Sequence, residues 1–312
     1  MTQENINNTK LLVVIRCLVY NHEPYLRDCL EGFVMQQTNF PFVAIVHDDA
    51  STDGSAAIIR EYGEKYPDII KPIYEAENKY SKHDGSLGRI INAAVDATGA
   101  KYVAMCEGDD YWTDPLKLQK QVDFMETNPE YGMICSSAKQ YTQKTQSFDG
   151  IIGKKGDEIF ENMFVGYSDL ITPSVLMRKD LYSRCLDELQ PLRQLNLLFD
   201  TAIWYWFALY SKIYLIEEPL VVYRVLENSA CHSTCPMKLL GMQQRYLNLK
   251  IAFMTTIKDF SDDKFIWMTK ELIKIENDTI RYAQSLGEQK VRSSFAYKIG
   301  KYITSIFSKF KK

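Results

Sequence analysis

Two adjacent carboxylates, Asp109 and Asp110, are the residues of this 312-residue chain whose type and spacing point most directly to chemistry. They follow the apolar run 102–106, which predicts a buried strand that breaks at Glu107-Gly108. Two such charges repel each other by about 4 kcal/mol at about 4 Å in an effective dielectric near 20. A divalent cation removes that repulsion, and oxygen ligands suit Mg²⁺ or Mn²⁺, which usually also hold substrate phosphates. The alternative is a turn whose acidic side chains only cap the next helix.

A repeated alternation of strands and helices is expected to position these residues. Continuous apolar runs predict buried strands, and amphipathic stretches between them predict helices. The expected strands are 11–19, 42–46, 69–74 at an edge, 102–106, 132–136, 170–178 and 214–223. The expected helices are 25–36, one from residue 56, 89–97, one that restarts near Thr113 and runs over 117–125, and one headed by Asp200. Residues 139–158 lack periodicity and are interpreted as a surface excursion or a β-ribbon. The alternation predicts a doubly wound α/β sheet, in which ligands bind outside the carboxyl ends of the strands.

Three stretches in a fixed order carry a resemblance to a known family. They read LVVIRCLVYN at 12–21, AIVHDDASTDGS at 44–55 and EGDDYW at 107–112, and a fourth lies near Asp200. Each motif alone is weak, but their order and spacing are specific. The chain resembles the family 2 glycosyltransferases over roughly residues 10–230. The resemblance implies the GT-A fold, a Rossmann-like, mostly parallel sheet flanked by helices, and inverting transfer from a nucleotide-diphosphate sugar.

The resemblance assigns the nucleotide base to the first two loops. Tyr20 takes the position of the family's base-stacking tyrosine, with Asn21 after it, and an acid of the second loop, Asp48 or Asp49, bonds the base edge. An aromatic face and a carboxylate that accepts a ring N–H both suit a base. The alternative is helix capping by Asp49 and Ser51, which can hold at the same time.

The resemblance assigns the diphosphate and the metal to the next two loops. Arg89 takes the place of the family's diphosphate-binding arginine, with Asn92 behind it. That arginine is more often directly next to an asparagine, so the spacing here departs from the family pattern and leaves a plain surface arginine as the alternative. Asp109 is assigned to the nucleotide sugar and, with Asp110, to a Mn²⁺ or Mg²⁺ ion.

The fourth motif supplies a candidate catalytic base. Asp200 precedes an aromatic helix and keeps the second position of the family's acid pair, while Phe199 replaces the usual glutamate. The resemblance implies that Asp200 is the base, and its apolar neighbours are expected to raise its pKa and so favour proton transfer near neutral pH. The alternative is an N-cap for the helix that follows.

A further ligand is expected in the loop after Tyr223-Arg224, which is mobile over the donor in the family. His232 lies in that loop and is a candidate ligand of the metal. Cys231 and Cys235 beside it raise the alternative of zinc, although a structural zinc site takes four ligands at a set spacing.

The composition narrows the class of protein. With 46% hydrophobic and 25% charged residues it is typical of a globular protein, and the net charge of −3 argues against a nucleic-acid partner. The seven cysteines include no CxxC pair, and Cys17 and Cys106 are interpreted as buried thiols of a reducing compartment. The polar first ten residues lack a signal-peptide core, and no apolar run reaches about 18 residues, which predicts a cytoplasmic location.

The sequence changes character near residue 236, which predicts a glycosyltransferase domain over 1–235 and a C-terminal helical region over 236–312. Helical periodicity covers 238–258 and 264–286. Beyond it, an aromatic and isoleucine face is surrounded by basic residues between Lys290 and Lys312, which is typical of a helix on a membrane surface. The alternative is a helix docked on the domain or on a second subunit, so a homo-oligomer stays open.

Together these patterns predict a metal-dependent inverting glycosyltransferase. Its expected donor is a UDP-sugar, and its expected acceptor is a saccharide or lipid-linked precursor of a surface polysaccharide such as capsule or O-antigen. A degenerate nucleotide-sugar-binding protein is the non-enzymatic alternative, against which the retained Asp109, Asp110 and Asp200 argue. A sugar nucleotidyltransferase or a dehydrogenase would need a glycine-rich loop after the first strand, where the residues YNH stand instead.

Overall fold

The computed structural model describes residues 11–153, 160–166, 170–195, 198–226, 236–257 and 259–285. The chain divides into two compact units, Met1–Glu227 and Asn228–Lys312. Within the described residues every strand belongs to one nine-stranded sheet in the first unit. The candidate site residues that fall within the described ranges all lie in this first unit.

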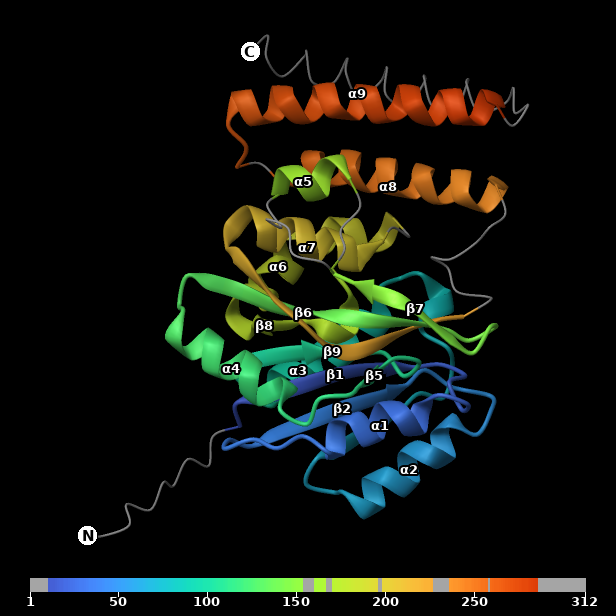
Figure 1. Cartoon of the computed structure of the whole chain (residues 1–312), viewed down its shortest axis with the longest axis vertical. Coiled ribbons are helices and arrows are strands. Elements are labelled where there is room, and N and C mark those ends of the chain that lie inside the picture. The colour runs from blue at the N-terminus through green and yellow to red at the C-terminus, as the bar shows by residue number, and fades with distance from the viewer. Residues whose placement is uncertain are drawn as a thin grey trace. The chain divides into compact units, whose positions relative to one another are not determined.

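The parallel half of the sheet has the order β3-β2-β1-β4. Its strands are β1 (Val13–Val19), β2 (Phe42–Asp48), β3 (Ile70–Tyr74) and β4 (Tyr102–Met105), and the helices between them are α1 (Leu26–Val34), α2 (Ser55–Lys65) and α3 (Ser86–Ala97). Right-handed crossovers put α1 and α2 on one face, seen together in Figure 1, and α3 on the other. The strand order reverses between β1 and β4, which is where open α/β sheets form a crevice for ligands.

The remaining strands make the sheet mixed. β8 (Leu176–Arg178) lies antiparallel between β4 and β6 (Tyr131–Thr142), and β9 (Lys212–Val225) runs parallel to β6. The edge strand β5 (Tyr111–Trp112) is antiparallel to β9, and β7 (Ser147–Ile152) forms a ribbon with β6. The expected sheet flanked by helices is therefore confirmed, and residues 139–152 form the ribbon rather than an irregular excursion.

Helices and 3₁₀ turns complete the first unit. They are α4 (Lys117–Thr127), α5 (Phe160–Val165), α6 (Lys179–Glu188), α7 (Phe199–Tyr210), η1 (Tyr80–Lys82), η2 (Thr172–Ser174) and η3 (Gln190–Leu195). The core follows the apolar runs of the sequence, because β1 and β4 are buried on both faces and α1 turns its apolar side inward. Cys17 and Cys106 are buried free thiols, as predicted.

Three expected element bounds are wrong. No helix restarts near Thr113, because Thr113 and Asp114 donate their backbone N–H groups to Leu220 O and so continue the pairing of β5 with β9. α4 begins only at Lys117, after Asp114 Oδ1 has accepted the N–H of Leu116 at 2.6 Å.

The other two errors concern the first residue of α3 and the length of β8. α3 begins at Ser86 rather than Arg89, because Asp84 Oδ1 accepts the N–H of Ser86 at 2.8 Å and starts the helix there. The expected strand over 170–178 is reduced to β8, because Pro173 lies in η2 and has no N–H for a sheet.

The second unit contains two helices that pack against each other, α8 (Pro236–Thr256) and α9 (Asp262–Ser285), which confirms the expected periodicity over most of both stretches. In the described part of the chain, no helix has the length and apolar character needed to cross a membrane. Cys231, His232, Cys235 and the basic stretch 290–312 lie outside the described residues.

Candidate active site

The loops that follow β1, β2 and β4 meet at one edge of the sheet, because these strands are parallel neighbours. The backbone at this edge turns sharply, since Asn21 has a φ of 55° and Ala50 a φ of 60°. Asn21 joins the first two loops, because its N–H donates to Ser51 Oγ at 2.9 Å and its Oδ1 accepts the N–H of Thr52 at 2.8 Å. Tyr20 beside it is 44% exposed, so its ring remains free to stack.

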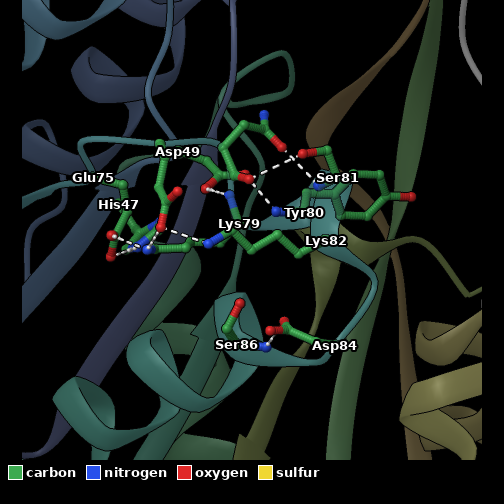
Figure 2. Close-up of polar contacts among 11 residues, drawn as sticks. His47, Asp49, Glu75, Lys79, Tyr80, Ser81, Lys82, Asp84 and Ser86 are labelled. Atoms are coloured by element: carbon green, nitrogen blue, oxygen red, sulfur yellow. Dashed lines mark hydrogen bonds and ion pairs between the residues drawn. The ribbon is translucent and has the colours of Figure 1, made fainter.

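The two acids at the end of β2 do different things. Asp49 accepts the N–H of Lys79 at 2.7 Å and that of Tyr80 at 2.9 Å, one on each carboxylate oxygen (Figure 2). Asp48 is only 2% exposed, and its Oδ2 accepts the N–H of Ser51 at 3.2 Å. Its Oδ1 is buried without a partner in the described part of the chain. Asp49 therefore holds the η1 turn, while Asp48 keeps an unused acceptor.

Neither acid caps α2, because at its start the N–H of Gly54 donates to Glu23 Oε2 at 2.7 Å and the N–H of Ser55 donates to Asp53 Oδ1 at 3.0 Å. The turn that Asp49 holds is also tied to β2 by charged side chains (Figure 2). His47 Nε2 lies 3.2 Å from Glu75 Oε1, and Lys79 Nζ lies 3.6 Å from the other oxygen of Glu75. The loop between β3 and α3 is thus fixed to the end of β2 at several points.

The acidic loop after β4 is held from β9. The backbone N–H of Arg224 donates to Asp110 Oδ1 at 2.8 Å, and Arg224 Nε donates to the carbonyl of Asp109 at 2.8 Å. Asp110 is 4% exposed, whereas Asp109 is partly exposed. Burial, and then the negative charge of Asp109, raise the pKa of Asp110 well above its usual range. The pair therefore stands in an environment that a cation would stabilise.

Gly108 lets this loop approach the loop after β1. A Cβ at this position would lie 2.7 Å from His22 Nδ1 and 3.0 Å from Val19 Cγ2. Any other residue would push the acidic loop away from the end of β1, so the glycine in this motif has a steric reason.

Arg224 is the functional candidate to which the sequence analysis gave no role. Its side chain is nearly buried, and it also donates to Gln143 Oε1 at 3.0 Å and to Asp28 Oδ2 at 2.9 Å. Its guanidinium stands over the rings of three tyrosines, Tyr25, Tyr111 and Tyr141, at 4.9, 5.1 and 5.6 Å. The signal in the sequence was an arginine directly after the apolar run 219–223.

Glu107 and Asp200 complete the acidic side of the crevice. Part of Glu107 reaches solvent, yet desolvation by the loop around it, and then the charges of Asp109 and Asp200, raise its pKa to about 7. Asp200 lies in the first turn of α7, where its Oδ1 accepts its neighbour Thr201's N–H at 2.8 Å. Within the described residues its side chain is exposed, which differs from the desolvation expected for it, while residues 201–207 behind it are buried.

Arg89 lies in the first turns of α3 with an exposed side chain, and its Nη1 donates to Asp84 O at 2.8 Å. Asn92 follows it on α3 and has a structural role in the core, because its Oδ1 accepts a hydrogen bond from the Tyr182 hydroxyl at 3.2 Å. Arg89 is therefore free to reach a ligand at the helix start, and Asn92 is not.

The acidic pair fits a divalent cation that takes few protein ligands. In the described ranges no three side chains of His, Cys, Asp or Glu converge on one point. Mg²⁺ and similar ions are usually bound by one or two carboxylates, with water and substrate phosphates filling the other positions. Asp109 and Asp110 supply such a pair. His232, the candidate further ligand, lies outside the described residues.

The chain matches the family model of glycosyl transferase family 2 over residues 17–186. An uncharacterised protein of Mycobacterium tuberculosis is 45% identical over 113 residues, which are 36% of this chain and 30% of that protein. The chain thus spans about a third of the length of the first curated relatives. The putative glycosyltransferase EpsE of Bacillus subtilis is 28% identical over 217 residues, 68% of this chain and 71% of EpsE.

Two solved structures share the fold. S. aureus TarS, solved with UDP-GlcNAc, superposes with a TM-score of 0.62 at 16% identity, over 94% of this chain and 81% of that one. The mannosyltransferase PcManGT of Pyrobaculum calidifontis, solved with GDP-Man and Mn²⁺, gives a TM-score of 0.55 at 14% identity, over 95% and 83%. Because the family model spans more than half of the chain and these structures share its mixed sheet and flanking helices, the protein belongs to glycosyl transferase family 2 and has the GT-A fold.

Proposed function

We propose that this protein is a metal-dependent inverting glycosyltransferase that uses a UDP-sugar. The observation that carries the proposal is the acidic pair Asp109 and Asp110, held at the crevice by Arg224, with Asp200 within electrostatic range of the same loop. TarS was solved with UDP-GlcNAc and PcManGT with GDP-Man and Mn²⁺, which supports a nucleotide sugar and a metal.

The first two loops would bind the nucleotide. The exposed ring of Tyr20 stacks on the base, and the unused Oδ1 of Asp48 accepts a ring N–H. Asp49 acts as a positioning residue, because both of its oxygens already hold η1. Asn21 likewise shapes the site by joining the two loops. Arg89 extends from the start of α3 to the diphosphate.

Asp109 and Asp110 would hold Mn²⁺ or Mg²⁺, which neutralises charge on the departing nucleotide diphosphate. Asp200 accepts the proton of an acceptor hydroxyl. That oxygen forms a bond to the anomeric carbon while the bond from this carbon to the diphosphate oxygen breaks, and the diphosphate leaves with the electron pair. A single displacement inverts the anomeric centre, as in inverting glycoside hydrolysis with a hydroxyl in place of water. The exposure of Asp200 leaves room for a bulky acceptor.

The acceptor class rests on relatives. EpsE is a putative glycosyltransferase, and TuaG of Bacillus subtilis, 33% identical over 120 residues, is named for teichuronic acid biosynthesis. We therefore propose a saccharide or lipid-linked acceptor in surface-polysaccharide synthesis. On this proposal the region 236–312 is a helical extension whose basic end rests on the cytoplasmic membrane face, with His232 in the loop before it.

A thermal-shift screen of nucleotides and nucleotide sugars, with and without Mn²⁺, tests the donor class. A ligand that binds only the native state at 100 times its Kd stabilises it by about 2.7 kcal/mol. We expect UDP and UDP-sugars to stabilise the protein only when Mn²⁺ is present. Stabilisation that is equal without metal would contradict the metal assignment, and no stabilisation by any nucleotide would contradict the proposed function.

A further inference from the structure

Two partly buried arginines beside the crevice each have one nitrogen that no hydrogen bond of the described residues satisfies. Arg16 of β1 and Arg193 of η3 each carry a buried Nε without a hydrogen-bond partner, and neither forms an ion pair within the described residues. Arginine is seldom buried unless it is paired. Burial, and also the nearby charge of Arg16, lower the pKa of Arg193. Two cations held together without a counter-ion are a place where a bound anion lowers the free energy.

The start of α3 lies beside one of these side chains. Cβ atoms added at Gly85 and Gly88 would be in ordinary van der Waals contact with Arg193, 3.9 Å from its Cβ and 4.0 Å from its Nη1. The guanidinium of Arg193 stands 5.5 Å from the centre of the Phe199 ring. Within the described residues, the Nε of neither arginine meets a carboxylate.

The arginine pair borders the space between the two acidic groups of the proposed mechanism. Arg16 pairs with Met105 in the sheet register, and its carbonyl accepts the N–H of Cys106 at 3.2 Å, directly before the acidic loop. Arg193 packs on Phe199, the residue before Asp200. On the proposed function, the transferred sugar must lie between Asp109, at the leaving-group end, and Asp200, at the acceptor end.

A third polar group lies between Gly85 and Gly88, the two glycines beside Arg193. Ser86 is the first residue of α3, and its Oγ is buried without a partner in the described part of the chain. Its backbone N–H is held by Asp84, as Figure 2 shows.

We infer that Arg16 and Arg193 form a subsite for a carboxylate on the transferred sugar, so that the donor is a nucleotide-linked uronic acid. This inference rests on the proposed function. A guanidinium fork matches the two oxygens of a carboxylate, and such charge-assisted pairs are about twice as strong as neutral ones. A neutral hexose would leave both arginines unpaired, so the site would select against it. The diphosphate of the donor is the other anion that could meet these arginines.

Donors that differ only at C6 of the sugar separate these two anions. UDP-glucose and UDP-glucuronate form one matched pair, and UDP-galactose and UDP-galacturonate form another. Their affinities, and that of UDP, would be measured by calorimetry with Mn²⁺ for the wild type, Arg193→Gln, Arg16→Gln and the control Arg60→Gln. Arg60 is an exposed arginine on α2, outside the crevice. Thermal unfolding identifies any variant that does not fold, and Arg193→Lys, which keeps the charge, provides a second variant at the site.

For the wild type we expect the uronate of at least one pair to bind about tenfold more tightly than its neutral partner, the usual scale for a hydrogen-bonded charge. Arg193→Gln and Arg16→Gln should remove this preference without changing the affinity for UDP, and Arg60→Gln should retain it. Equal affinities within both pairs would overturn the inference alone. A Gln variant that loses UDP affinity as strongly as uronate affinity would assign the arginines to the diphosphate. No binding of any UDP compound would overturn the proposed function, and this inference with it.

Discussion

Replacing Arg224 by methionine should release the acidic loop from β9. The substitution keeps an unbranched side chain but removes three donated hydrogen bonds and the contact with three tyrosine rings. The backbone N–H that binds Asp110 remains. The loop would therefore keep one of its two attachments to residue 224.

The size of the effect follows from the burial of each partner. The bonds to Asp109 O and Gln143 are formed by a nearly buried cation, and such bonds contribute about 1.5–3 kcal/mol each. The ion pair with Asp28 contributes little, about 0–1 kcal/mol, because Asp28 is 58% exposed. Part of the loss is offset, because methionine retains apolar contacts with the rings. We expect the free energy of unfolding to fall by about 3–5 kcal/mol.

A loss of stability alone would not show that Arg224 positions the metal pair, so a matched control is needed. Arg178 is also a partly buried strand arginine, and it donates to Tyr131 O at 2.8 Å and Met125 O at 2.6 Å, in a region that includes no loop of the site. Arg178→Met should destabilise the protein comparably but leave Mn²⁺-dependent UDP affinity unchanged.

Calorimetry well below the unfolding temperature of both variants makes this comparison. Arg224→Met should weaken Mn²⁺-dependent UDP binding about tenfold or more, because part of the binding energy must then order the loop. The reasoning is refuted if Arg224→Met binds UDP and Mn²⁺ like the wild type, or if Arg178→Met loses the same affinity.

Three further predictions test other parts of the site and the core. Asp110→Asn should fold, because its Oδ1 can still accept the N–H of Arg224, but should lose the metal dependence of UDP binding; calorimetry with unchanged Mn²⁺ dependence would contradict this. Asp200→Asn should bind UDP normally, but its rate of sugar transfer should fall by about 100-fold or more. Near-normal turnover would place the base elsewhere. Burial lowers the pKa of Lys117 from 10.5 to about 7. Between these pH values the unfolded chain binds more protons than the folded one, so the free energy of unfolding should rise with pH by about 1.4 kcal/mol per pH unit. Below the folded pKa this slope vanishes. Lys117→Met should remove this rise in denaturant titrations, and an unchanged slope would refute the assignment.

The apolar runs were sufficient to predict the parallel half of the sheet, because β1, β2 and β4 are buried along most of their length and their hydrophobic pattern is continuous. They could not predict β5. A two-residue strand has no periodicity, and Tyr111 pairs with Val222, more than a hundred residues later in the chain. The expectation of a helix near Thr113 failed for the same reason, since the backbone partner of Thr113 is Leu220.

The site shows a similar limit. The acids of the second and third motifs could be named from the sequence, but Asp48 and Asp49 could not be told apart, because the difference lies in two backbone N–H groups of η1. The unsatisfied Nε atoms of Arg16 and Arg193 within the described residues likewise depend on tertiary contacts, such as that of Arg193 with the start of α3. Tertiary contacts determine these roles, and such contacts cannot be inferred from a single sequence.

In both adjacent acid pairs, tertiary contacts give the two carboxylates different environments. At the end of β2, the buried Asp48 has one carboxylate oxygen without a hydrogen bond in the described residues, while both oxygens of Asp49 accept backbone N–H groups that fix the next loop. After β4, Asp110 receives an N–H from the distant strand β9, while Asp109 is partly exposed. Each pair thus includes an acid that orders a neighbouring segment, so the same short motif both builds the crevice and supplies its proposed ligands.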